Sequence, residues 1–87
     1  MLHAYQIILI DVRTNIKRVH THHNTEHVVY LTNEQVANDV AKSLENTYTT
    51  SKVELVYQCV DCGSHMYPKE TYVISEKSIC EECYYSG

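Results

Sequence analysis

Cys59-Val60-Asp61-Cys62-Gly63 and Cys80-Glu81-Glu82-Cys83 are the two stretches that decide how the last third of this chain folds. Each is a C-x₂-C pair, a spacing that lets a tight turn direct both sulfurs at one ion. Two pairs supply the four thiolates of a closed, tetrahedral structural zinc site, and the seventeen residues between them suit zinc binding. Gly63 fits the position after the first turn, where φ is often positive. The pattern therefore predicts structural Zn²⁺ bound by Cys59, Cys62, Cys80 and Cys83.

Two disulfides, or an iron centre, are the other uses that four cysteines allow. No secretory signal is visible, because the apolar run Ile7–Ile10 is short, lacks a basic segment before it and ends in Asp11. We therefore expect a cytoplasmic protein, whose cysteines stay reduced and available to a metal. The segment 57–63 resembles the first half of a rubredoxin, an iron protein. Tyr84 follows the last cysteine where a rubredoxin has a second glycine, which favours zinc.

The region between and after the pairs predicts a zinc-stabilised hairpin finger. Residues 71–74 and 78–79 form its strands, and Glu81 and Glu82 favour a helix start because acidic side chains complement the helix dipole. A second pair on the first turn of a helix is typical of a treble clef. The run 59–83 resembles the C-terminal zinc finger of the DksA/TraR family, which implies that the four cysteines are zinc ligands. The resemblance is confined to this finger, because no acidic-tipped coiled coil precedes it, and binding in the RNA polymerase secondary channel is not implied.

The rest of the chain predicts a small α+β fold, an antiparallel sheet with one packed helix in the order β-β-β-α-β. Residues 4–12 are apolar on both alternating faces, which is typical of a central strand. We expect further strands at 16–22, 27–31 and 52–58, the last with Val53, Leu55 and Tyr57 on one face. The predicted domains are an α+β body over 1–56 and the finger over 57–87.

One helix is expected after residue 32. Thr32 and Gln35 have the spacing of a capping box, and the helix should end near Asn46. Its apolar stripe repeats at helical spacing and consists of Val36, Ala37, Val40, Ala41, Leu44 and Tyr48. The opposite face carries Glu34, Asn38, Asp39, Lys42 and Glu45.

Composition bears on the class of function. Eleven Asp and Glu against seven Lys and Arg give a formal net charge of −4, which disfavours a phosphate backbone as partner. No stretch approaches a membrane span, and no G-x-S-x-G or glycine-rich phosphate loop is present. Four cysteines also leave zinc no open position for catalysis. We therefore expect no enzyme and no membrane partner, but a small zinc-binding protein-interaction module that modulates a larger protein.

Several features bear on the partner. Asn, Ile, Lys and Tyr are common and Gly and Pro scarce, a bias typical of AT-rich genomes, so a phage regulator of host machinery is one candidate. The helix face with Glu34, Asp39 and Glu45, together with the terminal tyrosines, is the expected protein-binding surface. The apolar first strand and the tyrosines also leave a homodimer open.

Two other clusters carry alternatives. His20, His22, His23 and His27 lie around one predicted hairpin, where a second metal site is an alternative to plain surface histidines. His65 follows the first cysteine pair and is expected at the surface rather than as a ligand. Arg13, Lys17 and Arg18 form a basic hairpin over 13–23 with the same histidines, and a nucleic-acid-binding finger using it is the alternative function.

Overall fold

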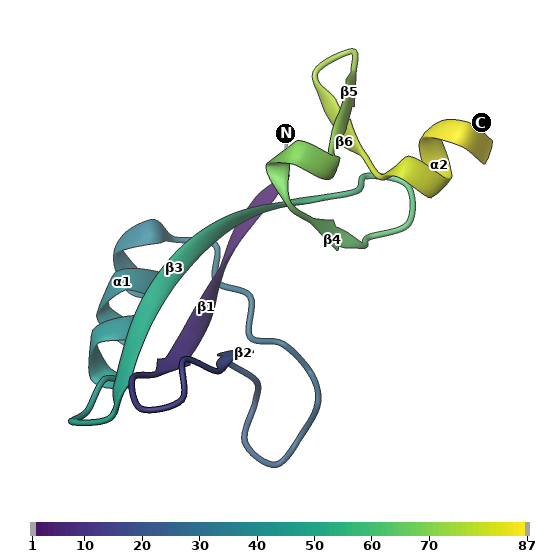
Figure 1. Cartoon of the computed structure of the whole chain (residues 1–87). Helices are drawn as coiled ribbons and strands as arrows, with labels where there is room; N and C mark the ends of the chain where they lie inside the picture. The colour runs from purple at the N-terminus through teal and green to yellow at the C-terminus, as the bar shows by residue number, and fades with distance from the viewer. Residues whose placement is uncertain (1, 87) are drawn as a thin grey trace. The chain divides into compact units, whose positions relative to one another are not determined.

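The computed structural model of this chain describes residues 2–86. Its elements, shown in Figure 1, are β1 (His3–Asp11), β2 (Lys17–Val19), α1 (Glu34–Ser43), β3 (Thr49–Gln58), β4 (His65–Met66), the 3₁₀ turn η1 (Pro68–Glu70), β5 (Tyr72–Ile74), β6 (Lys77–Ile79) and α2 (Glu81–Ser86). An antiparallel sheet has the order β2-β1-β3-β4, and β5 pairs with β6 in a second, two-stranded sheet. The predicted small α+β fold is confirmed.

Two compact units make up the described chain. The helical unit is residues 5–54, and the cysteine unit is residues 2–4 together with 55–86. Neither α1, with ten residues, nor α2, with six, has the length and apolar content that crossing a membrane requires, and the described residues contain no other α-helix.

β1 is one of the two inner strands of its sheet, as its apolar residues on both faces predict. It lies between β2 and β3, and Leu9 pairs with Arg18 of β2. Ile7 and Leu9 are buried on one face and Ile8 on the other. Because β1 has buried residues on both faces, nearly every one of its middle residues can be apolar.

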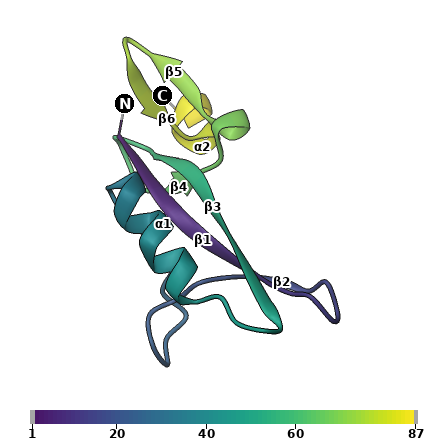
Figure 2. The same ribbon diagram turned by 90° about the vertical axis from the view of Figure 1, so that its left-hand side faces the viewer.

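The core of the helical unit lies between β1 and α1 (Figure 2). Ile7, Leu9 and Ala41 form its buried centre, and the partly buried side chains around them are Leu31, Val40, Leu44 and Val53. Ala37 is fully buried as well. Small alanines allow the helix to approach the strand closely, whereas Val36 and Tyr48, both expected in the apolar stripe, are about half exposed.

The helix begins and ends at residues other than those predicted. Asn33, and not Thr32, is the N-cap: its Oδ1 accepts a hydrogen bond from the Val36 amide at 3.1 Å. Asparagine is a stronger N-cap than threonine, and Gln35 donates to Asp39 instead of reaching back. The last helical residue is Ser43, three residues before the predicted end.

The predicted strand over 27–31 does not form. The segment makes only two isolated bridges, Thr21 with Val28 and Tyr5 with Leu31. It changes partner between these bridges, so no continuous ladder can develop. The predicted strand over 16–22 is reduced for the same reason to the three residues of β2.

β3 is longer than expected and changes its buried face. It begins at Thr49 rather than at residue 52, and it buries Val56 while Leu55 is exposed. The expected alternation of Val53, Leu55 and Tyr57 therefore does not hold along the whole strand. β3 runs from the helical unit into the cysteine unit, and each unit buries its own set of side chains.

Candidate metal centre

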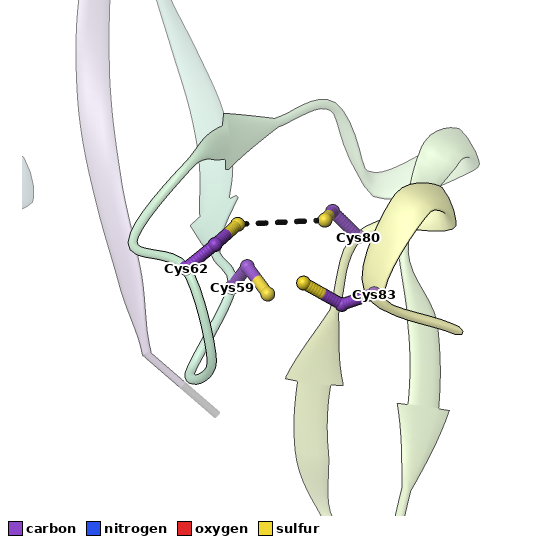
Figure 3. Close-up of side chains that lie close together, drawn as sticks. All are labelled: Cys59, Cys62, Cys80 and Cys83. Atoms are coloured by element: carbon purple, nitrogen blue, oxygen red, sulfur yellow. Dashed lines mark hydrogen bonds between the residues drawn. The ribbon is translucent and has the colours of Figure 1, made fainter. Parts of the chain in front are cut away.

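The four cysteines come from two segments of the cysteine unit and their sulfurs converge (Figure 3). Cys59 and Cys62 lie in the turn after β3, whereas Cys80 directly precedes α2 and Cys83 is in its first turn. Cys59 is buried and Cys62 exposed, and the other two are half-buried. The structure thus brings together all four residues that the sequence nominates.

The spacing of the sulfurs suits one tetrahedral ion. All four Sγ atoms lie within 4.8 Å of one another, and those of Cys62 and Cys80 are 3.6 Å apart. A zinc–sulfur bond of about 2.3 Å in tetrahedral geometry sets the sulfur–sulfur distance at about 3.8 Å. All four cysteines are free thiols. The four side chains can therefore hold a metal ion with only small adjustments.

Backbone hydrogen bonds shape the turn that carries the first pair. The Gly63 amide donates to the Cys59 carbonyl at 2.9 Å, and the Cys59 amide donates to the Ser64 carbonyl at 2.8 Å. Gly63 has φ +77°, in the left-handed region that the sequence predicts for this position. Gln58 supports the turn as well, because its Nε2 donates to the Gly63 carbonyl at 3.2 Å.

Gly63→Ala is expected to destabilise the cysteine unit by about 1 kcal/mol, because a β-carbon is disfavoured at positive φ. The new Cβ would meet nothing closer than Gln58 Nε2 at 3.7 Å, so the cost is conformational rather than a clash. Gly63→Asn should cost less, since asparagine tolerates this region better. Thermal unfolding of the zinc-loaded variants measures both. Equal losses for alanine and asparagine would contradict this explanation.

A tight hairpin places the second pair. Ser75 and Glu76 connect β5 to β6, and both have positive φ, 51° and 64°. Two such residues make the mirror-image turn that matches the twist of paired strands. β6 then leads directly to Cys80, whose carbonyl accepts the Tyr84 amide at 2.9 Å and starts α2. The predicted hairpin and the predicted helix start are both present.

Ser78 joins the hairpin to the first turn and is fully buried. Its hydroxyl donates to the Gln58 carbonyl at 2.6 Å, and its carbonyl accepts the Val60 amide at 3.0 Å. These bonds span about twenty residues of sequence and fix the two cysteine pairs relative to each other. Sequence reasoning missed Ser78, since only its alternation with Lys77 and Ile79 marks it as inward-facing.

Ser78→Ala should destabilise the cysteine unit by about 1–3 kcal/mol, because it removes the hydroxyl donor and leaves a carbonyl unpaired. Ser86→Ala, at an exposed serine, is the matched control and should change stability by less than about 0.5 kcal/mol. Chemical denaturation of zinc-loaded protein compares the two. If both variants behave alike, the buried hydrogen bond does not stabilise the unit.

Amides and hydroxyls prepare two of the sulfurs to be thiolates. The Cys62 amide, followed by the amides of Cys80 and Asp61, lowers the pKa of the Cys59 thiol to about 6. The Ser64 hydroxyl, 3.1 Å from Cys62 Sγ, lowers the pKa of Cys62. Ser64 is a second supporting residue that sequence reasoning missed.

The proximity of the four sulfurs contributes to raising the pKa of the other two thiols, Cys80 and Cys83. For Cys80, the Cys83 amide favours the thiolate, but burial and the neighbouring thiols outweigh it and raise the pKa. The pKa of Cys83 is raised by hydrogen bonding with Cys80 first, then with Cys62 and Cys59. Four thiolates this close repel one another. A bound cation removes that penalty.

The histidines do not add a second centre in the described part of the chain. Across residues 2–86 the four cysteines are the one group of three or more metal-binding side chains close enough to share an ion. His20, His22, His23 and His27 do not form such a group. His65 lies in β4, partly buried, and burial lowers its pKa.

Comparisons of the chain with protein-family models, with curated proteins and with solved structures find no match. The character of this site therefore rests on its own geometry, which is that of four cysteine thiols placed to hold one metal ion.

Proposed function

We propose that the four cysteines bind one structural Zn²⁺ and that the protein is a small interaction module whose cysteine unit presents a surface to a larger protein. The convergence of four sulfurs within 4.8 Å carries the proposal. Zinc is preferred because four thiolates form its usual closed structural site. Such a site has no open position for water or substrate, which supports a structural rather than a catalytic metal.

Native mass spectrometry tests the metal assignment. Untagged protein should carry one zinc per chain, and the excess mass should be lost when the same sample is denatured in acid. A red protein that contains iron would instead indicate a rubredoxin-like iron centre. A metal-free chain whose mass is four protons light would instead show two disulfides and refute the proposal.

A cluster of three tyrosines, of which Tyr84 and Tyr85 are exposed and Tyr72 is partly buried, supports the interaction role. The rings of Tyr72 and Tyr84 stack with centroids 4.2 Å apart, and Tyr85 meets both edge-on. Tyr85 is 71% exposed, and Ile74, on the same face of β5 as Tyr72, is 45% exposed. Tyrosines are enriched at protein interfaces. We call Tyr72, Ile74, Tyr84 and Tyr85 the tyrosine face.

The net charge of the cysteine unit indicates the kind of partner. Between residues 55 and 86 there are five carboxylates and two lysines, a net charge of −3: Asp61, Glu70, Glu76, Glu81 and Glu82 against Lys69 and Lys77. Four thiolates and one Zn²⁺ would make this unit more negative still. A protein surface that combines apolar groups with Lys or Arg would complement it.

Quantitative capture from lysate with matched variants tests this surface. Tyr85→Ala should lose a specifically bound protein that the wild type retains. Tyr48→Ala, which removes an exposed tyrosine from the helical unit, should retain it. Reversing the charges of Glu34 and Asp39 tests whether the exposed face of α1 contributes to partner binding. Identical capture by wild type and Tyr85→Ala, with zinc bound in both, would refute the tyrosine face as the interface.

A further inference from the structure

The basic segment of this acidic chain is confined to the helical unit. Residues 12–25 contain Arg13, Lys17, Arg18 and three histidines but no Asp or Glu. The whole chain has a formal net charge of −4, so this segment reverses the prevailing sign over a short stretch. In Figure 1 it comprises the turn after β1, the strand β2 and the beginning of the long loop towards α1.

Two hollows lie beside each other along this segment. The first, about 450 Å³, is lined by Leu9, Asp11, Arg13, Thr14, Ile16, Arg18 and Thr49. The second, about 280 Å³, is lined by Leu9 and by residues 18–24, which include His20, His22 and His23. Leu9 and Arg18 line both hollows, so Arg18 lies between them. We call these two hollows the basic track.

The two arginines of the basic track differ in their ion pairing. Arg13 pairs with Asp11 at 3.4 Å, and its guanidinium lies 4.3 Å from the centre of the Tyr48 ring. Arg18 is exposed and has no ion pair within residues 2–86. Its guanidinium therefore has no carboxylate partner within ion-pair distance in that range, and the one acidic side chain of the track, Asp11, is paired with Arg13. The threonines and histidines along the walls add hydrogen-bonding groups.

We propose that the basic track binds the sugar–phosphate backbone of a single-stranded nucleic acid. Arg18 would contact one phosphate and Arg13 a neighbouring one, and the guanidinium fork suits phosphate oxygens. An open track that extends along β2 fits a chain of phosphates better than one free phosphate. The Tyr48 ring is about half exposed, and its surface beyond the Arg13 guanidinium would stack with a base, the contact that single-strand binders use.

Adjacent residues of β2 provide a matched pair of variants. Arg18 lines both hollows, whereas Lys17 lines neither and lies on the opposite face of the strand. Arg18→Glu and Lys17→Glu make the same change in net charge at neighbouring exposed positions. A difference between them therefore reports on the track and not on overall repulsion.

Fluorescence anisotropy with zinc-loaded protein is the test. The probes are labelled oligo(dT) and oligo(rU) of about twelve nucleotides, within the range that single-strand sites cover, at about 20 mM salt, where phosphate contacts are strongest. Two phosphate contacts predict a slope of about −1.4 for log K against log salt. Arg18→Glu should weaken binding roughly tenfold or more, the size of losing one charge-assisted contact, and Lys17→Glu by less than about threefold.

Each remaining outcome overturns the proposal. No binding at low salt would exclude the site, and equal losses in the two variants would show only a net-charge effect. Equal binding of a duplex of the same length would refute the preference for single strands. Complete displacement of the oligonucleotide by equimolar inorganic phosphate would show that the track binds a free anion rather than a nucleic-acid backbone. Melting temperatures of both variants should match the wild type, and Arg18→Gln should give an intermediate loss if Arg18→Glu disturbs folding.

Discussion

Cys59→Ser is expected to abolish zinc retention and to unfold the cysteine unit while leaving α1 folded. Few residues of this unit are buried, namely Ala4, Val56, Cys59, Met66 and Ser78. So small a core needs further stabilisation, and a structural zinc site supplies on the order of 10 kcal/mol. The core of the helical unit is formed by Ile7, Leu9 and Ala41, none of which belongs to the cysteine unit.

Amide-resolved NMR distinguishes this outcome from global unfolding. Signals from residues 59–86 should lose their dispersion in Cys59→Ser, and in wild type treated with a strong chelator. Signals of α1 should persist, and added zinc should restore only the wild type. Val60→Ser, at an exposed neighbour that is not a ligand, is the control. An unchanged spectrum in both the variant and the chelated wild type would contradict a metal-dependent fold.

Ile7→Ala should be the most damaging apolar substitution in the helical unit. Ile7 is fully buried at the centre of the core between β1 and α1. Removing its methyl and methylene groups leaves a cavity and costs about 2–5 kcal/mol. Because small domains have a total stability of about 5–15 kcal/mol, this change removes a large part of it.

Urea unfolding followed by circular dichroism measures the loss. Ile7→Val, which deletes a single methylene, should cost about 0.5–1.5 kcal/mol. Its free energy of unfolding can therefore still be measured if the alanine variant does not fold. Ile16→Ala, at an isoleucine that is 66% exposed, should change stability by less than about 0.5 kcal/mol. Equal losses of stability in Ile7→Ala and Ile16→Ala would contradict a core centred on Ile7.

Features that depend on local pattern were predictable from sequence. The inner position of β1 follows from its apolar residues on both faces, and the hairpin over 72–79 follows from its short strands and polar turn. The convergence of the four cysteines follows from their two C-x₂-C spacings. In each case residues close in sequence contain the information.

Features that depend on competition or on distant partners were not predictable. Thr32 and Asn33 are both suitable N-caps, and only the observed bond to the Val36 amide decides between them. The segment 27–31 has strand propensity, yet its two bridging partners lie in different parts of the chain. Ser78 and Gln58 support the metal centre through a bond between residues twenty positions apart, and no local motif announces it.

The pairing of β1 along both of its edges has a consequence for solubility. Ile7-Ile8-Leu9-Ile10 is an uncharged apolar run with high β-propensity, the kind of segment that seeds aggregates. In the folded chain β3 lies on one edge, and the other is hydrogen-bonded in turn by Ile16, β2, His20 and Leu31. The folded strand therefore offers no open edge to a second chain over this run. Its release on unfolding would favour aggregation of destabilised variants.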